Sequence, residues 1–286
     1  ARSSALSYAV GEWARVWPLT RLIKSLGAYF IRRKSRGALY RKVLARYVQM
    51  ATDGGVTQAV FPEGGLTLDG KLRPPKMGLL TYVLDAYEPE GRDILFVPVA
   101  INYDRVLEDR VLIAADQRGD RRFGGKVTVV FKFVIRKLWQ RLTGRFLRFG
   151  KAAVVFGEPI SINSYGAKPD PERLATDLMH EISSIMPVLE VPLMCRVVLE
   201  ADKPMSADAM LSEIRSMAIQ CTGKVPQADS DGFGAMVEQA RLHLEHRKII
   251  QSGAQGWTLN EDERHVARFY ANSISHFFPE NAASAK

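Results

Sequence analysis

The chain has 286 residues, of which 47% are apolar, and its 40 Lys and Arg against 31 Asp and Glu give a formal net charge of +9. It is long enough to bury one substantial core, and no apolar run approaches the roughly 18–20 residues that cross a bilayer, so the sequence predicts no membrane-spanning helix. The two cysteines, Cys195 and Cys221, have no metal-binding spacing and suggest no disulfide framework, which indicates buried, reduced thiols in a cytosolic compartment.

The first half of the chain predicts alternating helices and strands. Apolar runs bounded by Gly and Pro indicate the strands. We expect helices over residues 7–26, 38–52 and 77–86, and strands over residues 28–32, 56–61, 94–101, 126–134 and 152–156. This alternation favours the α/β class, with a mixed, largely parallel sheet flanked by helices.

The second half is predominantly helical. Ser206 followed by Asp208, and Asn260 followed by three acids, place capping side chains and negative charge at helix starts. We expect helices over residues 171–186, 206–222, 233–251 and 260–278, with breaks at residues 187–192 and 222–231. The sequence therefore predicts an α/β domain over residues 1–165 and a helical subdomain over residues 166–286.

Positive charge is concentrated near the start. Residues 1–50 hold eleven Lys and Arg and one acid, residues 51–160 seventeen and thirteen, and residues 161–286 twelve and seventeen, so local charges of +10, +4 and −5 sum to +9. A basic face of this kind serves anionic lipid, nucleic acid or an anionic substrate. No stacking platform or nucleic-acid-binding module is recognisable, so we expect no nucleic-acid partner.

Two basic segments favour a membrane surface. Residues 32–42 are densely basic, and residues 132–151 carry seven cations and no acid. In the second segment apolar residues recur every three or four positions with arginines between them and Trp139 nearby, which is typical of an amphipathic helix in a membrane interface. An ordinary helix that packs its apolar stripe on the core is the alternative.

The loop FPEGGLTLDGKLRPPKMG, residues 61–78, is the most informative stretch. Gly64 and Gly65 follow an apolar strand and allow amide N–H groups to approach a ligand closely. Lys71, Arg73 and Lys76 follow, separated by prolines that stiffen the loop. This combination suits a phosphate or another compact anion, and the alternative is a solvated Gly/Pro turn.

Two more segments give the loop a family context. GAYFIRR at residues 27–33 delivers two arginines after a short strand, and VPVAINY at residues 97–103 lies on another apolar strand. In order and spacing, GAYFIRR, FPEGG and VPVAINY resemble the second, third and fourth blocks of the glycerol-3-phosphate acyltransferases, within the superfamily marked by an HxxxxD motif. RFYANSISH at residues 268–276 resembles the closing helical segment of that family.

The HxxxxD block itself does not occur in the 286 residues. The residues five positions after the five histidines are Ile185, Lys248, Gln251, Tyr270 and Asn281. The resemblance therefore implies a catalytic His and Asp upstream of Ala1, so that this fragment alone would be inactive. A family member that has lost the pair is the alternative.

The resemblance also implies an acceptor site. Arg33, with Arg32 beside it, would grip the phosphate of glycerol 3-phosphate, a task that suits guanidinium forks. Glu63 and Gly64 match the EG pair of the third block and, with Gly65, would shape the pocket beside the phosphate.

One departure from the family pattern bears on this site. Many members carry arginines just after EGG, where this chain has Leu66 and Leu68. The phosphate could instead be held by Lys71, Arg73 or Lys76. Lys76 also matches the family at its own position, so we rank it above Lys71.

The implied function is glycerol-3-phosphate O-acyltransferase, with acyl-CoA or acyl carrier protein as donor and lysophosphatidate as product. It implies no cofactor or metal, and a peripheral place on the cytoplasmic face of an inner membrane with anionic lipid. The alternatives are a non-catalytic basic membrane-binding module of the same fold, and a sister enzyme acting on lysophosphatidate or dihydroxyacetone phosphate.

Overall fold

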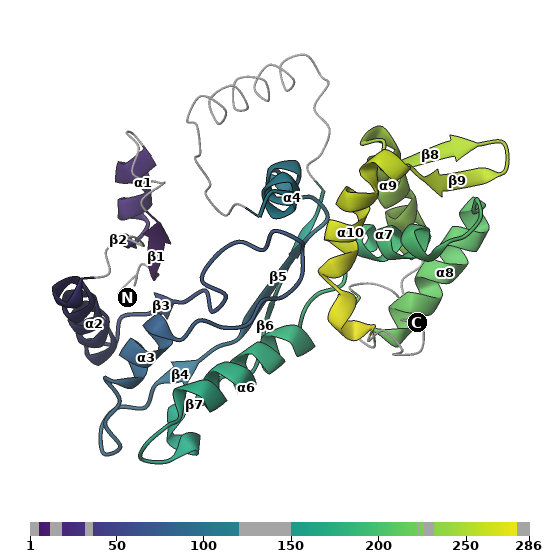
Figure 1. Cartoon of the computed structure of the whole chain (residues 1–286). Helices are drawn as coiled ribbons and strands as arrows, with labels where there is room; N and C mark the ends of the chain where they lie inside the picture. The colour runs from purple at the N-terminus through teal and green to yellow at the C-terminus, as the bar shows by residue number, and fades with distance from the viewer. Residues whose placement is uncertain are drawn as a thin grey trace.

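The structure is a computed structural model, and it describes residues 6–11, 19–31, 37–119, 150–221, 224–225 and 232–278. Helices and strands alternate up to α6 and helices dominate afterwards, which confirms the α/β class (Figure 1). The first elements are β1 (Ser7–Gly11), α1 (Leu19–Ser25), β2 (Ala28–Ile31), α2 (Ala38–Asp53), β3 (Gln58–Ala59), α3 (Gly78–Leu84), β4 (Leu95–Phe96), β5 (Val99–Tyr103), α4 (Asp109–Gln117), β6 (Ala152–Phe156) and β7 (Ile160–Ser161). They are followed by α6 (Pro171–Ser184), α7 (Glu190–Glu200), α8 (Ala207–Gln220), α9 (Phe233–His246), β8 (Ile250–Gly253), β9 (Gly256–Leu259) and α10 (Arg264–Asn272).

The described strands form small sheets of mixed direction. Three parallel strands pair in the order β2-β1-β3, with Tyr8 opposite both Ala28 and Ala59. The pairs β4–β7 and β5–β6 are antiparallel, as is the hairpin β8–β9. In β5 alternate residues are buried, so Ala100 and Asn102 face the core and Ile101 faces outward.

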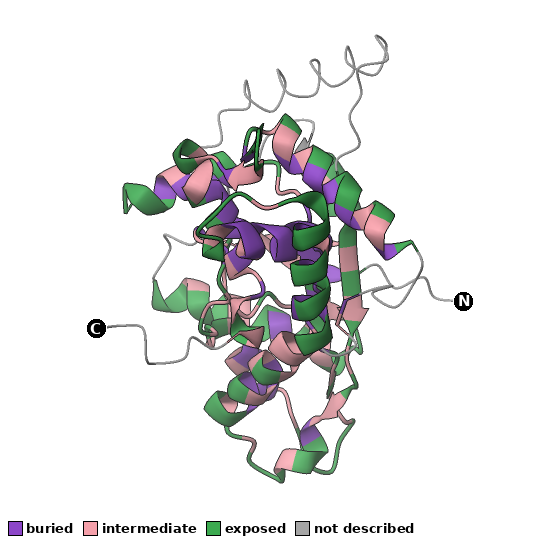
Figure 2. Cartoon of the chain, turned by 90° about the vertical axis from the view of Figure 1, so that its right-hand side faces the viewer, coloured by how far each residue is buried: buried purple, intermediate pink, exposed green. Residues whose placement is uncertain are grey.

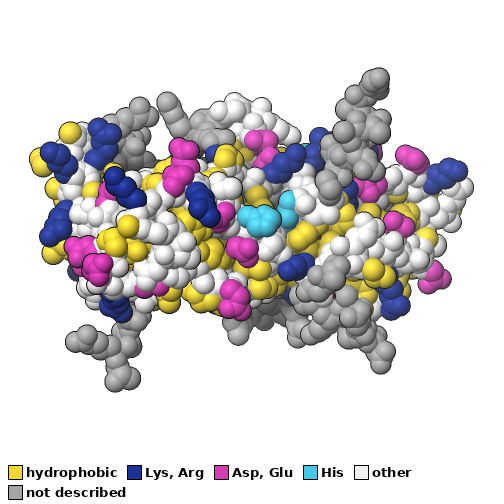
Figure 3. Space-filling model, turned by 90° about the horizontal axis from the view of Figure 1, so that it is seen from below, with side chains coloured by type: hydrophobic (Ala, Val, Ile, Leu, Met, Phe, Trp, Pro, Cys, Tyr) yellow, Lys and Arg dark blue, Asp and Glu magenta, His cyan; other side chains and the backbone are white. Residues whose placement is uncertain are grey.

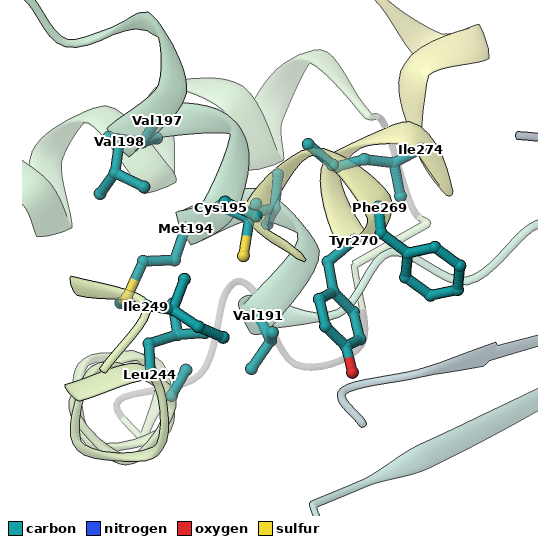
Figure 4. Packing of buried hydrophobic residues seen from close by; sticks show 14 of the residues in the cluster. Val191, Met194, Cys195, Val197, Val198, Leu244, Ile249, Phe269, Tyr270 and Ile274 are labelled. Atoms are coloured by element: carbon teal, nitrogen blue, oxygen red, sulfur yellow. The ribbon is translucent and has the colours of Figure 1, made fainter. Parts of the chain in front are cut away.

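Two apolar cores hold the described residues together. The smaller lies between α3 and α6, where Leu80 and Leu84 meet Leu174 and Leu178. The larger surrounds α7, which is buried over most of its length. Figure 2 shows buried residues in the middle of the molecule, with exposed ones towards the outside. Figure 4 shows side chains from α7, α9 and α10 packed in this core, with the Tyr270 hydroxyl at its margin.

Residues of the first half complete the larger core. Leu68 from the loop after β3, and Leu112, Ile113 and Ala115 from α4, belong to the same buried cluster as the helices α7 to α10. The helix α6 packs on α3 in the smaller core. The division at residue 165 therefore remains a prediction about folding units, since packing crosses it in both directions.

Several sequence-based predictions of elements are wrong in detail. Residues 7–11 form strand β1, not the start of a helix, because they pair with both β2 and β3. The strand predicted over residues 94–101 is two strands, since Pro98 has no N–H to continue a ladder, and its carbonyl accepts from Gly157 N at 2.8 Å.

Further differences occur later in the chain. The predicted break at residues 187–192 contains the start of α7, because Pro192 lies in the first helical turn, where an N–H is not needed. The helix predicted to reach residue 251 ends at His246, and residues after it form the hairpin β8–β9. The predicted strand at residues 126–134 and the basic segment up to residue 149 lie outside the described residues.

The predicted caps and thiols agree with the structure. The Ser206 hydroxyl accepts from Ala209 N at 3.2 Å, and the Asn260 side chain accepts from Asp262 N at 3.2 Å. Cys195 and Cys221 are both buried and free. Burial raises the pKa of both thiols, which favours inert packing groups over reactive ones.

Candidate functional site

The parallel sheet brings two of the matched segments to one edge. Because β2 and β3 both run parallel to β1, their carboxyl ends lie at the same edge of the sheet. Strand β3 leads into the 61–78 loop there, and β2 ends there at Ile31. Arg32 and Arg33 follow Ile31 in sequence but lie outside the described residues, so their predicted role stays a prediction.

Backbone hydrogen bonds close the loop at its base. Lys76 N donates to Pro62 O at 2.7 Å, and Gly64 N donates to Phe61 O at 2.9 Å. Gly64 has a φ of +64°, a conformation that favours glycine. A Cβ at Gly64 would lie 2.7 Å from Cδ of Lys76, so the Lys76 side chain crosses directly over this glycine.

Glu63 and Arg73 face each other across the loop. The backbone N–H of Arg73 donates to the Glu63 carboxylate, and Arg73 Nη1 donates to Leu66 O at 3.2 Å. Burial raises the pKa of Glu63, and the hydrogen bond and charge of Arg73 oppose that rise. Arg73 is therefore occupied in bracing the loop, and Glu63 shapes the loop.

Lys71 and Lys76 occupy different parts of the loop. Both side chains are exposed, and no Asp or Glu of the described residues forms an ion pair with either. Lys76 lies at the base beside Gly64 and half-buried Gly65, near the sheet edge, whereas Lys71 lies at the tip. Lys76 is thus the lysine that lies beside the two glycines, and its ranking above Lys71 as an anion ligand stays a prediction.

The tip of the loop is a compact hydrogen-bonded turn. The Thr67 hydroxyl donates to Asp69 Oδ1 at 3.0 Å and accepts from Gly70 N at 3.1 Å. Asp69 Oδ1 also accepts from Lys71 N at 3.1 Å. These bonds pair the Thr67 hydroxyl and the Asp69 carboxylate with amides of the same turn, which favours its compact shape.

The VPVAINY segment is tied to the C-terminal helices through Asn102. Its side chain donates to Pro187 O at 2.9 Å and to Ser273 Oγ at 3.3 Å. Asp104, one residue beyond the segment, accepts from Lys151 N at 3.2 Å and from Val191 N at 3.4 Å. The end of β5 is thereby fixed against the first turn of α7.

A pair of buried carboxylates lies at that junction. Asp104 and Glu190 are both almost fully buried, and the Lys151 ammonium is 3.0 Å from Glu190 Oε1. Burial, with the charge of Glu190 second, raises the pKa of Asp104 to about 6 despite the hydrogen bonds that it accepts.

A second polar cluster lies between α4, α9 and α10. The Tyr270 hydroxyl donates to Asp109 Oδ2 and accepts from Val106 N at 3.0 Å and from Arg247 Nη1 at 3.0 Å. Arg247 also forms an ion pair with Asp109. Because every member has partners, this buried network specifies how the three helices pack.

The site has the composition of an anion-binding loop and contains no obvious metal centre. Among the described residues, no group of three or more His, Cys, Asp or Glu could hold a metal ion. Within the same residues, no helix is both long and apolar enough to span a bilayer. The loop supplies glycine-rich backbone and two exposed lysines that form no ion pair among the described residues, which is the composition expected of an anion-binding loop.

Comparison with known proteins places the chain among acyltransferases. The family model described as Acyltransferase matches residues 5–102, which include the sheet edge and the loop. The model described as Glycerol-3-phosphate acyltransferase C-terminal region matches residues 137–285, about half of the chain. The chain belongs to the glycerol-3-phosphate acyltransferase family.

Two curated relatives illustrate the similarity. The chain is 27% identical over 302 residues to the Mycobacterium tuberculosis (strain H37Rv) protein named "Putative acyltransferase plsB1", with 99% of this chain and 47% of the relative covered. It is 27% identical over 288 residues to the glycerol-3-phosphate acyltransferase of Pseudomonas aeruginosa PAO1, with 90% and 33% covered. The chain thus spans half or less of the length of these relatives.

Proposed function

We propose that the whole protein is a glycerol-3-phosphate 1-O-acyltransferase, which moves an acyl group from acyl-CoA or acyl carrier protein to glycerol 3-phosphate and releases lysophosphatidate. The observation that carries this proposal is the loop with Lys76 over Gly64, located within a segment matched by the acyltransferase model and followed by the region matched by the glycerol-3-phosphate acyltransferase model. Both substrates carry phosphate, so an anion-binding loop suits this chemistry.

The proposed reaction divides the work between binding and proton transfer. The acceptor hydroxyl attacks the thioester carbonyl, a base takes the hydroxyl proton, and the thiol leaves with a proton. A neutral His oriented by a carboxylate suits the base near pH 7. Lys76, with Arg32 and Arg33, is assigned to holding the phosphate in register, and Glu63, Gly64 and Gly65 are assigned to shaping the pocket beside it.

The experiment that tests the acceptor site compares two lysines of one loop in the full-length protein. Lys76→Ala should raise KM for glycerol 3-phosphate roughly tenfold, as expected when a charge-assisted contact to phosphate is lost. Lys71→Ala, an equally exposed lysine at the tip, is the matched control and should leave that KM within about twofold. KM for the acyl donor should be unchanged in both variants.

The same assay can reject the proposal. If the full-length wild-type protein transfers no acyl group from palmitoyl-CoA to labelled glycerol 3-phosphate but still binds vesicles, the non-catalytic membrane module becomes the better account. Equal effects of the two lysine variants would remove Lys76 from the site. An Arg33→Ala variant extends the test, with a rise in KM for glycerol 3-phosphate expected.

We also propose that the protein lies on an anionic membrane surface through α2. Exposed apolar side chains recur along one face of this helix at Leu39, Val43, Tyr47 and Met50, with exposures of 77%, 59%, 48% and 59%. Arg41, Lys42 and Arg46 are exposed on the same helix, with Lys42 and Arg46 next to the stripe. In Figure 3, Lys and Arg side chains gather with apolar ones at the end of the molecule where Figure 1 shows α2. A basic amphipathic helix of this kind suits anionic lipid.

A further inference from the structure

Helix α10 and the residue that follows it contact two segments that resemble family blocks, the 61–78 loop and the end of β5. On one side, it meets the tip of the 61–78 loop, and on the other it meets the end of β5 and the start of α4. In Figure 1, α10 lies between the helices of the C-terminal half and α4, next to β5. Its position joins two segments that are far apart in sequence from α10 itself.

The contact with the loop is close and specific. The Asn272 side chain donates to Asp69 O at 2.7 Å. A Cβ at Gly70, whose φ is +87°, would overlap the carbonyl oxygen of Phe269 in α10. The neighbouring Leu68 is buried in the core around α7 and α10. A side-chain hydrogen bond, a backbone approach and an apolar anchor therefore hold three consecutive residues of the tip, Leu68, Asp69 and Gly70.

The other contacts show that α10 is itself firmly held. Ser273 accepts from Asn102 of β5, and Tyr270 bonds with Val106, Asp109 and Arg247. The loop is thus held at its base by the hydrogen bond from Lys76 N to Pro62 O and at its tip by α10. A binding loop that is ordered before its ligand arrives does not lose that conformational entropy on binding.

We propose that α10 is the positioning element of the anion-binding loop, and that Asn272 is its positioning residue. Asn272 touches no substrate; it fixes Asp69 and Gly70, and through them the wall of the loop formed by Gly64 and Lys76. This inference rests on the proposed function, because it assigns the C-terminal helices a part in binding glycerol 3-phosphate.

The first test replaces the amide donor at residue 272 with a carboxylate. Asn272→Asp keeps the shape of the side chain but cannot donate to Asp69 O. In full-length protein we expect KM for glycerol 3-phosphate to rise about tenfold, with KM for the acyl donor unchanged. Asn163→Asp is the matched control, because Asn163 accepts a hydrogen bond from Tyr87 that an Asp would keep.

The second test uses two glycines with similar φ values, +87° at Gly70 and +81° at Gly166. Gly70→Ala and Gly166→Ala both place a side chain at a positive φ, which strains the backbone at either position. A Cβ at Gly166 meets nothing within 4 Å, whereas one at Gly70 meets α10. We expect Gly70→Ala to raise KM for glycerol 3-phosphate and Gly166→Ala to leave it unchanged.

A readout without catalysis separates this inference from the proposed function. The amides of Gly70, Lys71 and Lys76 are hydrogen-bonded within the loop, so their hydrogen exchange reports its order. Faster exchange there in Asn272→Asp and Gly70→Ala, with exchange elsewhere preserved, would support the role of α10. Unchanged loop exchange, or faster exchange with an unchanged KM for glycerol 3-phosphate, would overturn it. A wild-type enzyme that does not acylate glycerol 3-phosphate would refute the proposed function instead.

Discussion

Two ionisable side chains, the buried Asp104 and the half-buried His243, respond to acid in opposite directions. Burial and Glu190 raise the pKa of Asp104 from 3.8 to about 6, so between these values the folded chain holds more protons than the unfolded chain, and the contribution of Asp104 to stability falls as pH rises. Burial and the nearby charges of Arg247 and Arg105 lower the pKa of His243 from 6.5 to about 4. The contribution of His243 to stability therefore falls as pH drops through the same window.

Single substitutions should expose these opposing contributions. As pH falls from 6.5 to 4, Asp104→Asn should lose up to about 3 kcal/mol of stability relative to the wild type. The reason is that Asp104 no longer offsets the stability lost when His243 is protonated in the unfolded chain. His243→Phe should gain stability relative to the wild type over the same interval. The measurement is urea unfolding at a series of pH values. Asp202→Asn, at an exposed position, is the control, and curves parallel to the wild type for the first two variants would contradict the assignment.

The hydroxyl of Tyr270 should matter more than its ring. Tyr270→Phe leaves Val106 N without its acceptor and Asp109 without one donor in a buried site, which should destabilise the chain by about 1–3 kcal/mol. Thermal or urea unfolding measures the loss. Tyr103→Phe, on the outward face of β5, is the matched control and should change stability by less than about 0.5 kcal/mol. Equal losses in the two variants would show that the network contributes little.

Residues of the site differ in how far sequence alone could predict them. Glu63, Gly64 and Lys76 were predicted together because they share one short loop, and the structure brings them together there. The role of Arg73 could not be read from its charge, since only the folded loop shows that Leu66 O and Glu63 occupy it. Asn272 was missed as a partner of the loop because no local pattern links it to Asp69.

At the scale of elements, α2 offers a direct test of membrane binding. Replacing Val43 and Met50 with Gln should weaken binding to anionic vesicles, because two exposed apolar side chains of the stripe are removed. Replacing Arg41, Lys42 and Arg46 with Gln should weaken it by about 1 kcal/mol per charge and reduce its dependence on salt. Vesicle sedimentation measures both effects.

The control for α2 removes similar apolar surface elsewhere. Val111 on α4 and Leu242 on α9 are exposed at 54% and 51%, so a Val111→Gln and Leu242→Gln variant has a matched loss of hydrophobicity. Its vesicle binding should equal that of the wild type. If the two double variants weaken binding equally, or neither does, α2 is not the attachment surface, and the basic segment at residues 132–151 becomes the next candidate.

Helices with strong local signals were the most predictable elements. The structure places α6 and α8 close to their predicted ranges, where capping side chains and apolar periodicity agree. β1 and α7 were missed for a common reason, since their conformations depend on partners. β1 is a strand because two other strands pair with it, and α7 is a helix in spite of Pro192 because nearly all of its side chains pack in the core.

At the scale of the whole molecule, the two halves should not fold independently at the predicted boundary. A polypeptide of residues 166–286 would expose Leu174 and Leu178 of α6, which pack against α3, and its larger core would lack Leu68, Leu112 and Ile113. We expect no cooperative urea transition for this fragment, in contrast to the 286-residue chain. A sharp transition would establish residues 166–286 as an autonomous domain.

The hydrogen bond between Asn272 and Asp69 spans 203 positions of the chain, and this separation has a consequence for synthesis. A ribosome delivers the chain from its N-terminus, at about 5–20 residues per second, so the loop emerges well before the helix that holds its tip. During that interval the core that Leu68 enters lacks the side chains that α10 supplies. The nascent chain therefore carries an incompletely covered apolar residue in this loop until α10 appears, and premature termination shortly before residue 272 would leave the loop without the helix that fixes its tip.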